Sequence, residues 1–257
     1  MDSSSHDNMS FLEHLEELRW HIIRSLIAIV SAGFICFLMK DFIFDTIIFG
    51  PKKMDFPTYK FLCQAATFIG VETTFCGDEF PFIVQNRTMA GQFSAHVMTS
   101  IISGFIISFP YILYEFWKFI SPGLLEKEKA KSRGFIFVSS MLFFIGVLFG
   151  YYIISPLSIN FLGTYQVSSQ VLNEIDLGSF ISLVRSSAIA SGIIFELPII
   201  IYFLTKAGVV TPESLVKYRK YALVLVLVLA AIITPPDVAS QIIVAIPIVV
   251  LYQVSIF

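Results

Sequence analysis

Charged residues are scarce in this chain. They make up 14% of its 257 residues, whereas soluble proteins carry about 25%. Hydrophobic residues reach 56% and the mean hydropathy is +0.80, which is more apolar surface than a water-soluble core can bury. The net charge of −2 says little by itself, because in a membrane chain the position of the lysines and arginines in particular loops matters more. A water-soluble domain and a nucleic-acid-binding protein are therefore both disfavoured.

Residues that usually carry chemistry are also few. The chain has four histidines and three cysteines, and they form no cluster with carboxylates at metal-ligand spacing. It contains no Gly-rich phosphate-binding loop, and no nucleophile stands at a readable spacing from a base. The lack of a nucleophile and a base at such a spacing argues against an intramembrane hydrolase. We therefore expect no enzymatic activity, no metal and no cofactor.

Long apolar runs, in contrast, are abundant. A hydrocarbon core of about 30 Å needs about 20 apolar residues in a helix. The sequence predicts an all-α polytopic membrane protein in which the last two of six transmembrane helices are short and form a hairpin. The first arm of that hairpin reaches only about 20 Å, so we expect local thinning of the bilayer there. The six predicted spans are residues 22–39, 95–114, 134–155, 177–205, 221–233 and 238–257.

Basic residues predict the orientation of the spans. Residues 118–133 carry five lysines and arginines and residues 206–220 carry four, which places both segments in the cytoplasm. On the opposite side, the connections 156–176 and 235–237 carry none, whereas the long segment 40–94 carries five, and long loops obey the rule poorly. Residues 1–20 lack the pattern of a secretory signal, and we expect them to stay in the cytoplasm uncleaved, with residues 1–9 as a disordered tail. Both chain ends are predicted to be cytoplasmic.

The segment 43–94 is too long and too aromatic for a simple linker, so we expect it to form a folded external cap. Pro51 lies in it, as do Cys63 and Cys76. In an oxidising compartment these two cysteines would close a small loop, a constraint of roughly 3 kcal/mol. The sequence leaves a disulfide and two free thiols equally open. Small residues at 146 and 150, and again at 188 and 192, predict a close approach of helices.

Glu196 stands out because it lies in the middle of a predicted span. A charged group at that depth costs roughly 2.5–3.5 kcal/mol on insertion scales, so it needs a polar cavity, a partner chain or a proton. A structural polar contact between helices is the plainer explanation. Pro198 favours a kink beside it, since proline has no N–H for the helical hydrogen bond. Arg185 lies about 16 Å away along the helix, too far to pair directly.

Two further groups of carboxylates lie outside the predicted spans. Residues 10–20 predict an amphipathic helix on the cytoplasmic surface, with Glu13 and Glu17 on its polar face. Glu126 and Glu128 belong to a charge run in the loop 118–133. From spacing alone, both groups are explained as well by ordinary solvated surfaces.

The ordered combination of four motifs nevertheless resembles the TatC family, the receptor and core of the twin-arginine protein translocase. The resemblance extends from about residue 10 to residue 257. Each motif is weak alone, and their order along the chain makes the combination specific. They are HLEELR (14–19), FPYILYEFWKFISPGL (109–124), FELP (195–198), and TPPD (234–237) with SQ at 240–241.

The resemblance implies that the cytoplasmic surface binds signal peptides with two adjacent arginines. Glu17 and Glu128 match the family's acidic positions and are implied as arginine acceptors, with neighbouring Glu16 or Glu126 as alternatives. Phe119 matches an aromatic position of the same recognition surface, and Arg19 an arginine that fixes the first helix. Glu196 matches the intramembrane carboxylate of the concave side, where partners and cargo engage. The positions that match residues shaping the cap, the fourth span and the last hairpin are Pro51, Phe195, Pro198 and Asp237.

By the same resemblance, the partners are signal peptides of folded cargo, small single-span subunits of the TatA and TatB type, and other copies of the chain. The expected location is the bacterial inner membrane, and the expected driving force is the proton gradient. The alternative from the residues is an ion-coupled secondary transporter, with Glu196 binding the proton and Arg185 the substrate. That alternative leaves the cytoplasmic carboxylates without a role.

Overall fold

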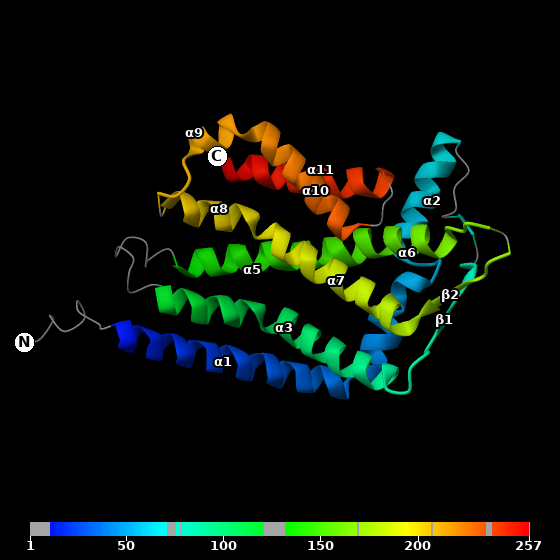
Figure 1. Cartoon of the computed structure of the whole chain (residues 1–257), viewed down its shortest axis with the longest axis horizontal. Helices are drawn as coiled ribbons and strands as arrows, with labels where there is room; N and C mark the ends of the chain where they lie inside the picture. Colours follow the sequence, from blue (N-terminus) through cyan, green and yellow to red (C-terminus); the bar gives the residue numbers. More distant parts are fainter. Residues whose placement is uncertain are drawn as a thin grey trace, which may run out of the picture. The chain divides into compact units, whose positions relative to one another are not determined.

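The computed structural model consists almost entirely of helices (Figure 1). It describes residues 11–70, 76–77, 79–120, 132–168, 170–206, 208–234 and 238–256. Within these residues, four helical stretches are long and apolar enough to cross a membrane. They coincide with the first four predicted spans: Leu15–Leu38, Gly91–Ile120, Gly134–Thr164 and Leu177–Lys206.

The described residues divide into two compact units. The smaller unit combines residues 11–38 with 100–120 and 132–140. It contains α1 (Phe11–Leu38), most of α3 (Gly91–Ile120) and the beginning of α5 (Ser132–Phe149). The predicted surface helix 10–20 and the first span are thus one unbroken helix, because no proline or glycine interrupts residues 11–32.

Within this unit, α1 and α3 approach so closely that their backbones touch. A Cβ added at Gly104 would lie 2.6 Å from the carbonyl oxygen of Ile29 and 2.7 Å from the Cα of Gly33. The Ser108 hydroxyl donates to the carbonyl of Ala28 at 3.0 Å. Small residues let the two helices pack along their length, which fixes the relative position of the side chains at their ends.

The larger unit holds the remaining elements. After α1 the chain forms a π-helical segment and a 3-10 turn, and then a helix and a strand of the predicted cap region. The π-helical η5 joins α5 to α6 without a break. The bounds are η1 (Phe42–Ile48), η2 (Gly50–Lys52), α2 (Pro57–Ile69), β1 (Phe82–Gln85), η5 (Gly150–Ile154), α6 (Ser155–Thr164), β2 (Asn173–Asp176), α7 (Leu177–Phe195), α8 (Leu197–Lys206), α9 (Pro212–Lys217), α10 (Arg219–Ile233) and α11 (Val238–Ile256).

Two strands depart from the all-α prediction. β1 pairs in parallel with β2, with Phe82 opposite Asn173 and Gln85 opposite Asp176. Each strand has only four residues, and the partners lie about ninety residues apart in sequence. Strands this short and this far apart leave no periodic signal in the sequence, which explains why the pairing was missed.

The last two helices lie side by side and share a buried apolar core with the end of η5 (Figure 1). With 15 residues, α10 reaches about 22 Å and is short, as predicted. With 19 residues, α11 reaches about 28 Å, close to the thickness of the hydrocarbon core. Among the described residues, α11 contributes Ser240–Ile256 as an apolar helix shorter than the four candidate spans, which agrees with the prediction that the last two helices are short.

Candidate functional site

One end of α1 and α3 forms an open groove of about 450 Å³. Helical spacing places Glu17, Trp20, His21 and Arg24 on one side of α1, and Lys118 of α3 completes the lining. Trp20 and Lys118 are exposed, whereas His21 is buried. The groove therefore combines one open carboxylate, two cations and an exposed indole.

A buried carboxylate underlies this groove. The side chain of Glu115 is 3% exposed, and its Oε2 accepts a hydrogen bond of 2.6 Å from His21 Nδ1. The nearest guanidinium nitrogen of Arg24 lies 3.8 Å from the same oxygen, and the Tyr111 hydroxyl also hydrogen-bonds this carboxylate. A buried charge is stable only when such partners replace water. Glu115 is thus compensated by groups of its own chain.

Glu17 has a different environment. Its side chain is 36% exposed, and its Oε1 lies 4.0 Å from His21 Nε2, which is too long for a hydrogen bond. The imidazole of His21 therefore stands between two carboxylates: it binds Glu115 tightly and leaves Glu17 accessible from the groove. Such a carboxylate is available to bind a cation from outside the chain.

The other predicted recognition residues are distributed as follows. The Phe119 ring lies 6.1 Å from the His21 ring in an edge-on arrangement, next to the groove. Arg19 is exposed, and its guanidinium lies 5.9 Å from the centre of the Trp20 ring. Glu16 is exposed but does not line the groove. Glu126 and Glu128 lie outside the described residues.

Sequence analysis missed Glu115, His21 and Arg24 as parts of this site. Glu115 belongs to the motif 109–124 and Arg24 to the first predicted span, whereas His21 lies between the predicted surface helix 10–20 and that span. Glu115 could have been identified from its position in an apolar helix. It lies one helical turn after Tyr111 and one turn before Phe119. The signal for His21 is its spacing of four residues from Glu17.

Glu196 marks an interruption of the fourth span. Helix α7 ends at Phe195 and α8 begins at Leu197, and Glu196, at 8% exposure, forms the C-cap between them. Its backbone carbonyl accepts hydrogen bonds from Ile199 at 3.0 Å and Ile200 at 2.9 Å, so the helical direction resumes after one residue. Ile194 and Leu197, on either side, pack against the core shared by α10 and α11. The kink predicted from Pro198 lies at this position.

Arg185 does not meet Glu196. In the described residues no ion pair joins them, and Arg185 Nη1 instead contacts the Thr99 hydroxyl at 3.5 Å. The two groups are thus arranged as the sequence distance predicted, and they do not form one substrate site.

Pro51 has a structural position in the cap. It is fully buried, and its carbonyl oxygen lies 2.9 Å from the hydroxyl of Tyr59, which is also 3.0 Å from the carbonyl of Pro156. Burial raises the pKa of Tyr59 well above the usual value of tyrosine. The hydroxyl therefore stays a donor at physiological pH and ties η2 and α2 to α6. Asp237 lies outside the described residues.

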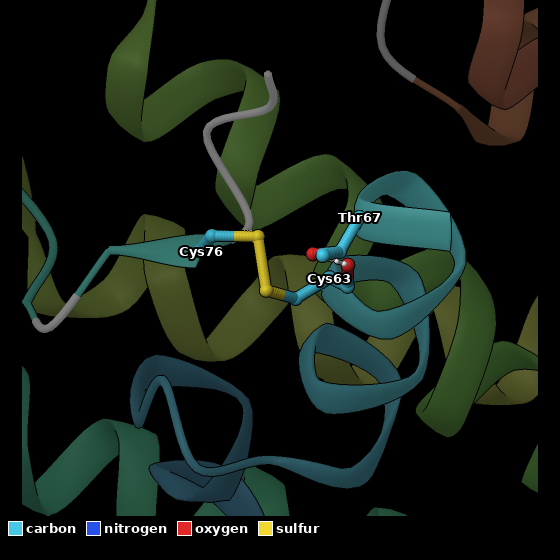
Figure 2. The surroundings of a disulfide bond; sticks show 3 residues. All are labelled: Cys63, Thr67 and Cys76. Atoms are coloured by element: carbon cyan, nitrogen blue, oxygen red, sulfur yellow. Dashed lines mark hydrogen bonds between the residues drawn. A yellow bond between two sulfur atoms is a disulfide. The ribbon is translucent and has the colours of Figure 1, made fainter. Parts of the chain in front are cut away.

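The structure joins Cys63 of α2 to Cys76 by a disulfide, with 5.1 Å between the Cα atoms (Figure 2). One turn after Cys63, the Thr67 hydroxyl donates to the Cys63 carbonyl at 2.8 Å, and α2 ends at Gly70 in the left-handed conformation. The bond ties the middle of α2 to the chain that leads into β1.

These features define a multi-pass helical membrane protein with a disulfide-bonded cap, a kinked fourth span and a polar groove at the start of its first helix. A family model described as "Sec-independent protein translocase protein (TatC)" matches residues 13–247. The chain belongs to the TatC family, whose members are protein translocase components.

Similar proteins span the full chain. Sec-independent protein translocase protein TatC of Blattabacterium sp. subsp. Periplaneta americana is 46% identical, covering 98% of this chain and 95% of that protein. TatC of Aquifex aeolicus is 37% identical, covering 97% and 94%. A crystal structure of "Twin Arginine Translocase Receptor- TatC in DDM" has a TM-score of 0.72 at 36% identity, covering 95% of this chain and 98% of that one.

Proposed function

We propose that this chain is the receptor subunit of a twin-arginine translocase and that its α1–α3 groove binds the arginine pair of signal peptides. The observation that supports this most is the half-open carboxylate of Glu17 in a groove next to an exposed tryptophan. The similar crystal structures are described as twin-arginine translocase receptors.

The chemistry of the groove suits guanidinium groups. An arginine side chain donates two parallel hydrogen bonds to a carboxylate, which the single ammonium of lysine does not reproduce. The Trp20 ring offers a face for cation–π contact. The cation Arg24, which would repel a ligand arginine, is already partly compensated by Glu115 at 3.8 Å. Glu17 is therefore the carboxylate that remains for the ligand.

Two arginines require a second acceptor. We assign this role to Glu128, with Glu126 as its neighbour, because the loop 118–133 continues directly from the Lys118 end of α3. On the α1 side, the groove favours Glu17 over Glu16, since only Glu17 lines it. Phe119 and Arg19 border the site and complete the recognition surface in this proposal.

Photo-crosslinking tests the assignment. A signal peptide with a photoreactive residue beside its two arginines is expected to crosslink to the protein in membranes. Glu17→Ala or Glu128→Ala is expected to abolish the crosslink, while Glu16→Ala, on the same turn but outside the groove, preserves it. Correct insertion is checked by protease protection of each variant. An unchanged crosslink in both Glu17→Ala and Glu128→Ala would refute the receptor assignment.

The remaining features belong to the same proposal. The chain crosses the bacterial inner membrane six times with both ends in the cytoplasm, places its cap outside, and assembles with single-span subunits and with further copies of itself. Export of folded cargo is driven by the proton gradient. The short α10 leaves the bilayer thin on one side, which would lower the barrier to passage of cargo.

Glu196 serves export rather than recognition in this proposal. It interrupts the fourth span at a buried position, far along the chain from the groove residues. Glu196→Ala is expected to keep signal-peptide crosslinking at the original level and to block export of a folded reporter. Glu196→Asp, which retains the carboxylate, is the matched control and keeps part of the export rate. Export at the normal rate in Glu196→Ala would remove this residue from the mechanism.

A further inference from the structure

A second cavity, of about 480 Å³, lies entirely within the larger unit. It is formed where three apolar helices give way to polar segments: after the end of α1 at Leu38, at the start of α3 and at the start of α7. The charged and aromatic residues that line it include Lys40, Asp41, Phe44, Asp45, Phe93 and His96. In the six-span topology proposed above, this level falls at the boundary between hydrocarbon and headgroups.

The cavity contains charges of both signs that its own chain leaves without ion pairs. Lys40, Asp41 and Asp45 are exposed, and in the part of the chain that the structure describes none of them forms a salt bridge. The π-helical turns of η1 bring Asp41, its N-cap, and Asp45 to the same cavity. Segments of π-helix occur frequently at functional sites.

Part of the cavity wall is apolar. Phe44 packs edge-on against His96 at 5.7 Å, and Ile181 is fully buried. One helical turn further along α3 and α7, beyond Ala95 and Ile181, Arg185 contacts Thr99. The Nε of Arg185 is buried, and among the described residues it has no hydrogen-bond partner. The positively charged guanidinium of Arg185 therefore lies one helical turn beyond the apolar residues of the cavity wall.

We propose that this cavity binds the headgroup of a phospholipid that carries a primary amine. Lys40 binds the phosphate, Asp41 and Asp45 bind the ammonium, and the apolar wall receives the first part of an acyl chain. Two carboxylates and one ammonium match a ligand with one negative and one positive charge. A purely anionic headgroup would meet the two carboxylates, and the quaternary ammonium of choline has no N–H to donate to them.

Native mass spectrometry of the delipidated protein tests the proposal. The protein is titrated with phosphatidylethanolamine, phosphatidylcholine and phosphatidylglycerol of identical acyl chains. Phosphatidylethanolamine is expected to bind about tenfold more tightly than the other two, the difference that one charge-assisted hydrogen bond supplies. Equal binding of phosphatidylethanolamine and phosphatidylcholine would overturn the proposal.

Variants assign the effect to the cavity. Asp41→Asn with Asp45→Asn is expected to remove the preference for phosphatidylethanolamine, and Lys40→Gln to weaken phosphatidylethanolamine and phosphatidylcholine equally. Asp55→Asn with Glu79→Gln is the matched control, because these acids lie in the cap region but do not line this cavity. An unchanged preference in the Asp41 and Asp45 variant would contradict the proposal, and the single Asp45→Asn variant gives the same test if the double variant misfolds.

A competition experiment separates a lipid from a soluble ligand of the same headgroup chemistry. Glycerophosphoethanolamine carries the phosphate and the ammonium without acyl chains. It is expected to displace bound phosphatidylethanolamine only at a large excess, about a hundredfold or more, because it lacks the apolar part of the contact. Displacement at equal concentration would assign the cavity to a soluble ligand and refute the lipid site.

Discussion

At the level of single residues, the carboxylate that lines the groove, Glu17, and the carboxylate beneath it, Glu115, have opposite surroundings. Glu115 is buried and bound by His21, Arg24 and Tyr111, whereas Glu17 is open to solvent and only 4.0 Å from His21 at its nearest approach. The first arrangement holds the helices and the imidazole in place. The second leaves a carboxylate for a ligand.

Replacing Glu115 tests this division of roles. Glu115→Ala leaves His21 and Arg24 without their buried partner, so the free energy of unfolding is expected to fall by about 3 kcal/mol. Thermal unfolding in detergent measures the loss. Glu16→Ala, an exposed acid on α1, is expected to change stability by less than about 0.5 kcal/mol. Equal stability of the two variants would show that the buried pair is not structurally important.

The sequence predicted part of this site. The order of motifs along the chain predicted Glu17, Arg19 and Phe119 as recognition residues; in the structure Glu17 lines the groove and the Phe119 ring lies 6.1 Å from the His21 ring. His21 and Glu115, 94 residues apart, were not paired, because their contact depends on how closely α1 and α3 approach. A linear pattern contains no information about that distance.

At the level of helices and strands, α5 and η5 pack closely against α7. A Cβ added at Gly146 would lie 2.7 Å from the carbonyl oxygen of Ser191, and one at Gly192 would lie 2.8 Å from the Phe143 ring. The prediction of close approach from small residues at 146, 150, 188 and 192 is confirmed. This packing positions α7, whose end carries Glu196.

Adding a methyl group at this contact is expected to separate the helices. Gly146→Ala faces backbone atoms that have no room to move, so a loss of about 1–3 kcal/mol is expected. Gly134→Ala, with no atom within 4 Å of the added Cβ, is the matched control and is expected to be neutral or stabilising by up to about 1 kcal/mol. Thermal unfolding of the two variants in the same detergent compares them. A loss as large at 134 as at 146 would contradict close packing as the cause.

Most of the helical residues were predictable from apolar runs alone, since each of the first four predicted spans is long enough to cross a membrane. The exceptions have specific physical causes. The strands β1 and β2 are short and far apart in sequence, and the π-helical segments η1 and η5 depend on local packing rather than on composition. The continuity of α1 was missed because its polar first turns differ in composition, not in backbone conformation, from the apolar part.

At the scale of the whole molecule, the proposed topology places the cap on one side of the membrane and the groove on the other. Glu79 lies in the cap region, Lys118 lies in the last turn of α3, and Glu213 lies in α9. With six spans and both ends in the cytoplasm, the first position is external and the other two are cytoplasmic.

Labelling of single cysteines tests this topology. The background variant carries Cys36→Ala and retains the Cys63–Cys76 disulfide, which does not react with maleimide. In intact cells a membrane-impermeant maleimide is expected to label Glu79→Cys, but to label Lys118→Cys or Glu213→Cys only after the membrane is broken. Labelling of Glu213→Cys in intact cells would contradict the cytoplasmic placement of α9 and with it the six-span topology.

In the proposed function, Glu17 in the α1–α3 groove discriminates arginine from lysine in the signal peptide. Fluorescence anisotropy of labelled peptides with the protein in nanodiscs measures this most directly. The protein is expected to bind a twin-arginine peptide at least about tenfold more tightly than the same peptide with two lysines. Glu17→Gln is expected to remove that difference, while Glu16→Gln retains it. If the Glu17→Gln variant still prefers the twin-arginine peptide as strongly as the original protein does, Glu17 does not select arginine.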